Sequence, residues 1–503
     1  MTRNNPWTQA QWNSIHGDSR NSDAVPYPTA AHYALKWHRL QGAAVLFGPT
    51  VDLDGNLYLC SGRGTNFSHL HALDTDGDLR WESEPWTNTG HIGPRACPFA
   101  PLVDASGAIF LADDQAFFCV EGDGSPRWRT DLHALGIREG FASAVFSASG
   151  HVGGVSLDGF AVLLDRATGA PVVPPLALPR GTPPPAASLP PGLWQGMMDK
   201  ETAAVLFPGF FGTHFPVTNS PAVDLDSGLL YITGAGDSAM QTRLYALREE
   251  ANQLRIVFTR QFDGRCSVTP SLSPSGHQVY TGNHRGELLA FAADSGTPLW
   301  RYAPAGPAAS PSVGSDGTIY TGSNTVPGAA SQLSAIDPET GEARWCRDYD
   351  ALASELLPER APLKPFFTDP RPHAVVNSVQ TLGRDHLLVV LALGYTFTPP
   401  GAAPLTQPHQ VVLASIDPGD GALTGYTRLP DTSEAGVVMA RDGSVYTCHA
   451  ALTSSIFYHG INPLLPPSHR TALEPKGGVT ALRPAVVNNP RSGRVAYKTN
   501  TTL

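Results

Sequence analysis

Residues 49–81 read PTVDLDGNLYLCSGRGTNFSHLHALDTDGDLRW, which are short apolar runs separated by turn residues. Asp54-Gly55 and Asp76-Gly77 stand between successive runs, and an Asp-Gly pair flanked by apolar residues is a strong signal for a β-hairpin. The stretch therefore predicts a meander of three strands, with a fourth strand still to be placed.

The same pattern returns along the chain, so we interpret the protein as an array of repeats. A second anchor, a glycine four residues before a tryptophan, follows in four of the repeats: Gly77/Trp81, Gly124/Trp128, Gly296/Trp300 and Gly341/Trp345. In three other repeats Val172, Phe258 and Tyr426 are candidates to replace the tryptophan. The first hairpin glycines of the eight repeats are Gly55, Gly107, Gly150, Gly228, Gly276, Gly317, Gly383 (in a degenerate repeat) and Gly443.

Eight units of four short strands predict an all-β fold, a single eight-bladed β-propeller of four-stranded antiparallel blades. A propeller is one domain whatever its length, so we expect residues 1–503 to form a single domain. Residues 34–40 look like the fourth strand of a blade that lacks its first three. We expect this strand to complete the last blade and close the ring, and residues 478–487 are the rival for that place.

Composition excludes some classes of partner. Only 16% of residues are charged and the net charge is −10, so no basic surface for nucleic acid is expected. No apolar run approaches the roughly 20 residues that span a bilayer, so membrane insertion is not expected. The N-terminus has no apolar signal segment. We therefore expect a soluble protein, cytoplasmic as written and periplasmic or secreted if a signal has been removed.

One part of the sequence resembles a known superfamily. The opening Trp12…Gly17-Asp18-Ser19-Arg20-Asn21 resembles the start of proteins with pyrroloquinoline-quinone-type propeller repeats. The recurring Gly-x-x-x-Trp element resembles the repeats of these proteins, over roughly residues 34–450. That superfamily includes quinoprotein dehydrogenases and the outer-membrane assembly scaffold BamB. The resemblance implies an eight-bladed propeller whose tryptophans dock between blades, and it says little about function.

Three insertions interrupt the repeats, at residues 174–216, 350–373 and 451–478, the last inside the eighth repeat. The first two join the outermost strand of one blade to the innermost strand of the next, so we expect both on one face. Long loops in a compact fold are usually functional or disordered. Each of these two carries a pair of phenylalanines near a histidine, Phe211 near His214 and Phe367 near His373. We expect both to act as lids over the mouth of the central channel.

The residues that precede each innermost strand, or follow each second strand, should ring that mouth. Histidines, arginines and carboxylates in such positions can bind a polar ligand or carry out acid–base chemistry. Three histidines in such positions, His91, His214 and His373, could in principle bind a metal. A metal is not expected, because they belong to blades far apart on the ring. The catalytic candidates are His91, Asp158, His214 and His373, and the ligand-binding candidates are Arg95, Trp194, Phe211, His214, Arg265, His284, Phe367, His373 and Asn377.

Three functions remain open. The first is a ligand-binding propeller with a lidded polar pocket, and the second is a non-quinone enzyme acting on a small molecule by acid–base chemistry. The third is a scaffold that binds protein partners. Pyrroloquinoline quinone is not expected as a cofactor, and no other cofactor is predicted. The dehydrogenases that this chain resembles stack the quinone between a tryptophan and a disulfide of adjacent cysteines, whereas none of the six cysteines here is adjacent to another.

Overall fold

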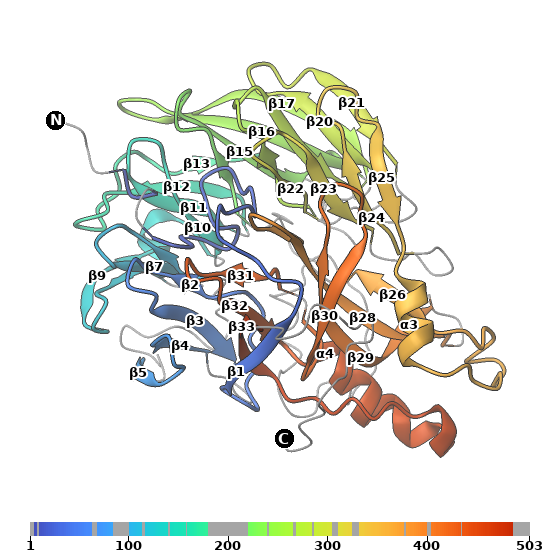
Figure 1. Ribbon diagram of the computed structural model, residues 1–503. Helices are drawn as coiled ribbons and strands as arrows, with labels where there is room; N and C mark the ends of the chain where they lie inside the picture. Colours follow the sequence, from blue (N-terminus) through green and yellow to red (C-terminus); the bar gives the residue numbers. More distant parts are fainter. Residues whose placement is uncertain are drawn as a thin grey trace.

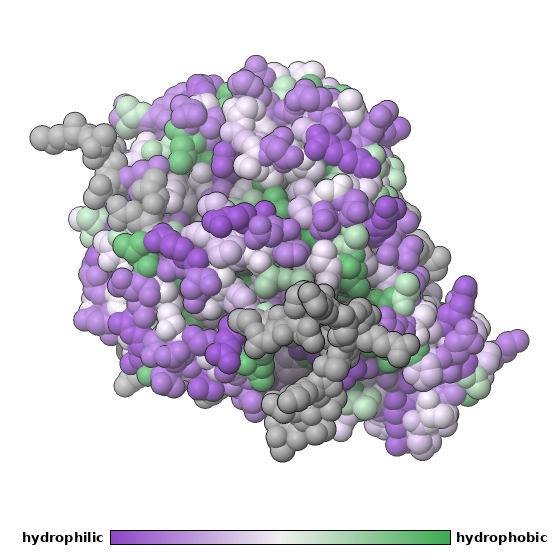
Figure 2. Space-filling model, in the orientation of Figure 1, coloured by the Kyte–Doolittle hydropathy of each residue, from purple (hydrophilic) through white to green (hydrophobic). Residues whose placement is uncertain are grey.

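The computed structural model describes residues 5–7, 10–62, 68–83, 100–112, 116–138, 141–156, 158–179, 220–238, 241–264, 268–283, 286–303, 310–323, 331–376, 379–399, 404–433 and 435–485. These residues form eight antiparallel sheets arranged in a ring (Figure 1), so the predicted eight-bladed propeller is confirmed. No helix in the described part is long and apolar enough to cross a membrane. Hydrophilic residues dominate the face seen in Figure 2, with hydrophobic ones scattered among them.

The first four blades follow the chain in order, each from its innermost to its outermost strand. They comprise β2 (Thr50–Val51), β3 (Leu57–Gly62), β4 (Ser68–Leu73) and β5 (Leu79–Glu82); β6 (Leu102–Val103), β7 (Ile109–Ala112), β8 (Ala116–Val120) and β9 (Pro126–Asp131), followed by the 3₁₀ turn η1 (His133–Leu135); β10 (Phe141–Phe146), β11 (Val152–Ser156), β12 (Phe160–Leu164) and β13 (Leu176–Ala177); and β14 (Ala222–Val223), β15 (Leu229–Ala235), β16 (Gln241–Glu249) and β17 (Leu254–Asp263).

The next three blades continue this order, except that the innermost strand of the seventh is divided in two, β26 and β27, which both pair with β28. They comprise β18 (Ser271–Leu272), β19 (Gln278–Gly282), β20 (Leu288–Ala292) and β21 (Pro298–Tyr302); β22 (Ser312–Val313), β23 (Ile319–Gly322), β24 (Leu333–Ile336) and β25 (Ala343–Arg347); and β26 (His373–Val376), β27 (Thr381–Leu382), β28 (Leu387–Phe397), β29 (Leu405–Ile416) and β30 (Leu423–Leu429).

The eighth blade takes strands from both ends of the chain, in the order β31 (Val438–Met439), β32 (Val445–His449), β33 (Gly478–Pro484) and β1 (Tyr33–Arg39). Strand β1 pairs antiparallel with β33, with Leu35 opposite Leu482. The expectation that residues 34–40 complete the last blade is therefore confirmed. The C-terminal run is not a rival for that place, because it supplies the third strand of the same blade.

The hairpin glycines are confirmed as turn residues. Seven of the eight have a positive φ, between 71° and 89°, a backbone conformation that costs glycine little and other residues more. The exception is Gly383 of the degenerate repeat, whose N–H instead donates to the carbonyl of His386 in a longer turn between β27 and β28.

The tryptophans of the outer strands fasten neighbouring blades together. Trp81 lies over Gly124 of the next blade, where an added Cβ would be 2.9 Å from the indole, and its Nε1 donates to the carbonyl of Gly122 at 2.9 Å. On its other side it contacts Tyr58 of its own blade. The equivalent docked pairs are Trp128/Gly169, Phe258/Gly296, Trp300/Gly341, Trp345/Gly421 and Trp37/Gly77. Phe258 thus replaces the tryptophan as expected, and Trp37 adds an anchor that the spacing pattern does not reveal.

Helices in the described part are few and lie mainly in two insertions. Helix α3 (Asp350–Leu356) lies in the 350–373 insertion. The 451–478 insertion contains α4 (Leu452–Ser455), the π-helix η2 (Ile456–Ile461), and the 3₁₀ turns η3 (Asn462–Leu464) and η4 (Pro467–His469). Both insertions lie beside the extended ends of β28 and β29 (Figure 1), and Phe367 and Phe457 both contact Phe397 of β28. We call this assembly the helical lobe.

Candidate functional site

Most of the candidates for the channel mouth lie outside the described residues. Of the predicted site residues, Asp158, Phe367 and His373 are described. The others lie outside the described residues: His91, Arg95, Trp194, Phe211, His214, Arg265, His284 and Asn377. Residues 180–216 of the first insertion also lie outside them. The lidded pocket therefore stays a prediction.

The carboxylate of Asp158 organises a turn between β11 and β12. One oxygen accepts a hydrogen bond from the Ser156 hydroxyl at 2.6 Å, and the other accepts from the backbone N–H of Arg138 at 2.9 Å. Asp158 is buried. Both oxygens therefore stabilise the loop, and this arrangement favours a structural role over acid–base chemistry.

His373 and Phe367 lie at the seventh blade. His373 begins β26, and its Nε2 is 2.9 Å from the Thr406 hydroxyl on β29. Burial lowers the pKa of His373, so the neutral imidazole is favoured. Phe367 is buried in the helical lobe against Phe397 and His469. The phenylalanine pair of this insertion is thus held by its own blade and by the 451–478 insertion.

A second candidate site lies in the channel itself, where residues 10–25 form a segment that we call the N-terminal strap. Its backbone groups bond to the last residue of each two-residue innermost strand in six blades, from Trp12 at Val51 to Val25 at Leu382. Four further partners in this series are Val103, Val223, Leu272 and Val313. A segment that bonds to innermost strands around the ring must cross the end of the channel. The strap therefore covers the channel at the face of the hairpin glycines.

The two remaining blades are also tied to this end of the chain. Trp7 Nε1 donates to the carbonyl of Phe146 in the third blade at 3.2 Å. The side chain of Gln11 accepts a hydrogen bond from the backbone N–H of Arg441 in the eighth blade at 2.6 Å. The N-terminal residues therefore contact all eight blades, as a central plug would.

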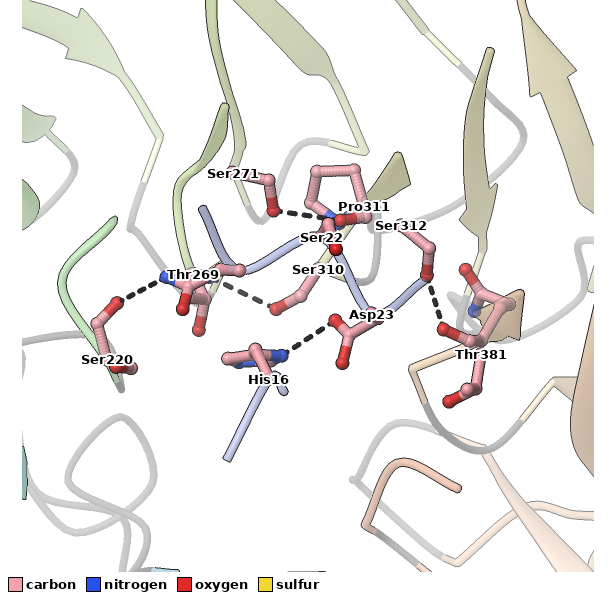
Figure 3. Close-up of polar contacts among 12 residues, drawn as sticks. His16, Ser22, Asp23, Ser220, Thr269, Ser271, Ser310, Pro311, Ser312 and Thr381 are labelled. Atoms are coloured by element: carbon pink, nitrogen blue, oxygen red, sulfur yellow. Dashed lines mark hydrogen bonds and ion pairs between the residues drawn. The ribbon is translucent and has the colours of Figure 1, made fainter. Parts of the chain in front are cut away.

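A buried histidine–aspartate pair lies inside the strap. His16 Nδ1 is 2.7 Å from Asp23 Oδ2, and both side chains are almost completely inaccessible to solvent. Burial raises the pKa of Asp23, although His16 opposes this effect. Figure 3 shows the two side chains pointing toward one another, together with Ser220, Thr269 and Ser310 from three successive blades.

Hydroxyl groups join the blades around this end of the channel. Ser271 Oγ donates to the carbonyl of Pro311 in the next blade at 2.8 Å, and Ser312 Oγ donates to the carbonyl of Gln380 in the blade after that. Thr381 Oγ1 continues the series by donating to the carbonyl of Val437 at 2.5 Å. Each of these three residues is the first of its innermost strand, so the contacts repeat with the blades.

Several buried polar atoms at this end have no hydrogen-bond partner in the described part of the chain. They are Ser14 Oγ, His16 Nε2, Asn21 Oδ1 and Thr269 Oγ1. Asn21 connects the fourth and fifth blades, because its Nδ2 donates to the carbonyls of Ser220 and Pro270 at 3.0 Å each. Buried polar atoms without protein partners are commonly satisfied by an ordered water or a ligand. These four atoms beside the strap are therefore candidates to bind one.

A groove of about 610 Å³ lies on the outer side of the strap, between it and the fifth to seventh blades. Its apolar floor includes Val25, Leu272 and Val313. Two arginines on its rim are tied to backbone carbonyls, Arg20 to Pro274 and Arg384 to Pro26, both at 3.0 Å. The groove therefore shows no assembled set of reactive groups.

The strap is the feature that sequence reasoning missed. Its residues Trp12–Asn21 signalled a family resemblance, but their partners are backbone groups of distant strands, which leave no pattern in the sequence. One related signal is present in the sequence. The innermost strands to which the strap bonds follow a serine or threonine and a proline in successive repeats, as in Ser-Pro-Ala-Val at 220–223 and Thr-Pro-Ser-Leu at 269–272.

Solved structures share the fold. The chain is similar to a europium-containing methanol dehydrogenase (12% identity, TM-score 0.56, covering 94% of this chain and 98% of that one). It is also similar to the quinohemoprotein alcohol dehydrogenase of Comamonas testosteroni (13%, TM-score 0.61, covering 98% and 83%) and to ADHIIG of Pseudomonas putida HK5 (14%, TM-score 0.57, covering 96% and 82%). Identities this low show the fold alone. No curated protein matches the chain.

The described tryptophans and cysteines do not form the stack of a tryptophan and two adjacent cysteines that holds the quinone in the dehydrogenases that this chain resembles. Five of the described tryptophans pack over glycines of the neighbouring blade: Trp37, Trp81, Trp128, Trp300 and Trp345. The described cysteines, Cys60, Cys119, Cys346 and Cys448, are free thiols, and no two of the six cysteines are adjacent. Within the described ranges, no group of three or more histidine, cysteine, aspartate or glutamate side chains could hold a metal ion.

A family model described as outer membrane protein assembly factor BamB matches residues 66–347, which is more than half of the chain. The match covers the blades in which the Gly-x-x-x-Trp anchors recur, and it agrees with the propeller resemblance inferred from those anchors. On this evidence the chain belongs to the outer membrane protein assembly factor BamB family.

Proposed function

We propose that this protein is a ligand-binding propeller whose site is the polar central channel, closed at one end by the N-terminal strap. The observation that supports this proposal is the set of four buried atoms without partners, Ser14 Oγ, His16 Nε2, Asn21 Oδ1 and Thr269 Oγ1. Burying an unpaired polar group costs about 1–3 kcal/mol. Four such atoms at one end of a channel favour occupation by a hydrogen-bonding group.

The described groups at this end suggest the chemistry of the ligand. They are hydroxyls, amides and an imidazole, with one carboxylate, Asp23, already paired with His16. This environment suits a neutral head group with several hydroxyls, such as that of a polyol or a sugar. In our proposal the ligand extends toward the opposite face, where Arg265 and Asn377 precede the fifth and seventh innermost strands in the sequence and the 174–216 insertion acts as a lid.

Binding without turnover agrees best with the candidates that are described. Asp158 uses both carboxylate oxygens to hold a loop, and His373 is hydrogen-bonded to Thr406. Neither is presented as a general acid or base beside a free reacting position. Acid–base enzymology at the mouth remains the alternative, through His91 and His214.

The test is calorimetric titration of the purified protein with monosaccharides and polyols, together with a high-resolution crystal structure to locate any bound molecule. Thr269→Val removes an unpartnered hydroxyl at nearly constant volume and should weaken binding at least tenfold. Ser315→Ala, which alters an exposed serine on the opposite side of the strap, is the matched control. Binding that Thr269→Val leaves unchanged would argue against the channel.

A protein-binding scaffold is the second candidate, favoured by the family description of an assembly factor. Leu464, at the end of the helical lobe, is 81% exposed and offers a position at which to test it. Replacing Leu464 by Glu should weaken a protein contact at the lobe without affecting small-molecule binding in the channel, so the two readings can be separated.

A further inference from the structure

The interior of the helical lobe contains an arginine in an unusual position. The guanidinium of Arg360 lies over the ring of Tyr395 at 3.9 Å from the ring centroid, a cation–π contact. Its Nη1 donates to Gln407 Oε1 at 3.1 Å and to the carbonyl of His469 at 3.4 Å. Its Nη2 is 2.9 Å from His409 Nε2. The contacts come from β28, β29 and the 451–478 insertion, so Arg360 is held in a fixed orientation at the centre of the lobe.

Arg360 has no counterion in the described part of the chain. No carboxylate of the described residues lies within 4.0 Å of its guanidinium, whereas Arg371 of the same insertion pairs with Asp369 at 3.1 Å. Among the described residues, no acceptor bonds to Arg360 Nε. The edge of a guanidinium formed by Nε and Nη2 is the edge that binds carboxylates and phosphates with two parallel hydrogen bonds. That edge keeps at least one donor unused here.

The electrostatics of the lobe disfavour additional positive charge. Burial, together with the charge of Arg360, lowers the pKa of His409 to about 3. Burial also lowers the pKa of Arg360 itself. A half-buried cation that is not neutralised carries a desolvation cost. A bound anion would remove that cost, because it would supply the charge that the protein side chains do not.

We infer that Arg360 is the centre of an oxyanion-binding site, which takes a carboxylate or a phosphate group on the Nε/Nη2 edge of the guanidinium. Tyr395 fixes the plane of the guanidinium, and Gln407 and the His469 carbonyl fix its rotation. His409 Nε2 is also 3.0 Å from Gln407 Oε1, so the imidazole is held beside the guanidinium. Carboxylate and phosphate share this recognition chemistry, and the experiment separates them. The site is distinct from the channel, so its failure would leave the proposed function untouched.

The test is calorimetric titration of the full chain with inorganic phosphate and, separately, with acetate, at constant ionic strength set with sodium chloride. Arg360→Gln should weaken binding of the preferred anion at least tenfold. Arg371→Gln is the matched control, because it removes an exposed arginine of the same insertion and should bind as the unaltered protein does. The arm that binds more tightly identifies the head group. No binding of either anion, or equal binding by Arg360→Gln, would overturn the inference.

A second measurement covers the case in which Arg360→Gln fails to fold. Crystals of the unaltered protein can be soaked in selenate, a tetrahedral oxyanion with an anomalous signal, and in acetate, a carboxylate whose difference density can be located directly. A peak within hydrogen-bonding distance of Arg360 Nε or Nη2 supports the site. If neither soak gives a peak at Arg360, the guanidinium only braces the lobe and the inference is wrong.

Discussion

The indole of Trp37 lies directly over Gly77, and a Cβ added to that glycine would be 2.6 Å from the ring. Trp37 belongs to the outermost strand of the eighth blade, and Gly77 to the last hairpin of the first. The indole Nε1 also donates to the carbonyl of Thr75 at 3.1 Å. The same arrangement of tryptophan, glycine and carbonyl joins the first blade to the second. The seam of the ring is thus held by the contact that the ring uses elsewhere.

We expect Trp37→Ala to destabilise the protein by roughly 3–5 kcal/mol, because it removes a large aromatic side chain from a packed interface between blades. Urea unfolding followed by fluorescence and circular dichroism would measure the change. Leu35→Ala is the control, since Leu35 lies on the same strand and is 47% exposed. Equal losses for the two variants would show that the seam does not depend on the docked indole.

The blades were predictable because their signals are local. A hairpin glycine with positive φ and a glycine four residues before a tryptophan are short patterns that sheet geometry repeats in each blade. Trp37 escaped the pattern because its strand β1 is not joined in sequence to its neighbour β33, so no hairpin glycine stands four residues before it. The strap escaped it because the bonds of Asn21 go to the backbone carbonyls of Ser220 and Pro270, about 200 or more positions away in sequence and without any required side chain there. The Phe367 environment depends on the fold of a second insertion, which no period predicts.

Contacts between adjacent blades inside the channel should contribute measurably to stability. Ser312→Ala removes the hydroxyl that donates to the Gln380 carbonyl and leaves that buried carbonyl without this bond. We expect a loss of about 1–3 kcal/mol in the free energy of unfolding. Urea unfolding of Ser312→Ala beside the exposed control Ser315→Ala would check it, and a difference below the error of the measurement would contradict it.

The pKa of His409 predicts a loss of stability in acid. In the folded protein this pKa is lowered to about 3, whereas an unfolded histidine titrates near 6.5. Between these values the unfolded chain binds the extra proton, so stability falls as the pH decreases through that window. One proton corresponds to about 1.4 kcal/mol per pH unit, or roughly 2 kcal/mol between pH 6.5 and pH 5.

The measurement is urea unfolding from pH 7 to pH 4.5 in a buffer without phosphate or carboxylate. His409→Gln should flatten the dependence by about one proton, whereas His133→Gln, which alters an exposed histidine, should not change it. His373 contributes in the same direction, because burial lowers its pKa too, so some dependence should persist in His409→Gln. An unchanged slope in His409→Gln would show that this histidine is not the titrating group.

Quinone-dependent oxidation should be absent. The chain has no adjacent cysteine pair, and the described tryptophans of the outer strands are engaged between blades. Purified protein incubated with calcium and pyrroloquinoline quinone should therefore not reduce an artificial electron-acceptor dye with alcohols or sugars as substrates. Sustained dye reduction that depends on the added quinone would overturn this reading of the channel.

The N-terminal strap and strand β1 should stabilise the ring in two separable steps. Removal of residues 1–25 deletes the strap, with its bonds to the innermost strands and the His16–Asp23 pair, but keeps β1 and Trp37. Removal of residues 1–40 deletes β1 as well and leaves β33 as an open edge. We therefore expect the melting temperature to fall for the first truncation and to fall further for the second. Removal of residues 1–4 is the control, because Trp7 and the strap are kept. If the 1–25 truncation melts at the same temperature as the control, the strap does not hold the blades together, and the proposed ligand site in the channel loses the wall that the strap would give it.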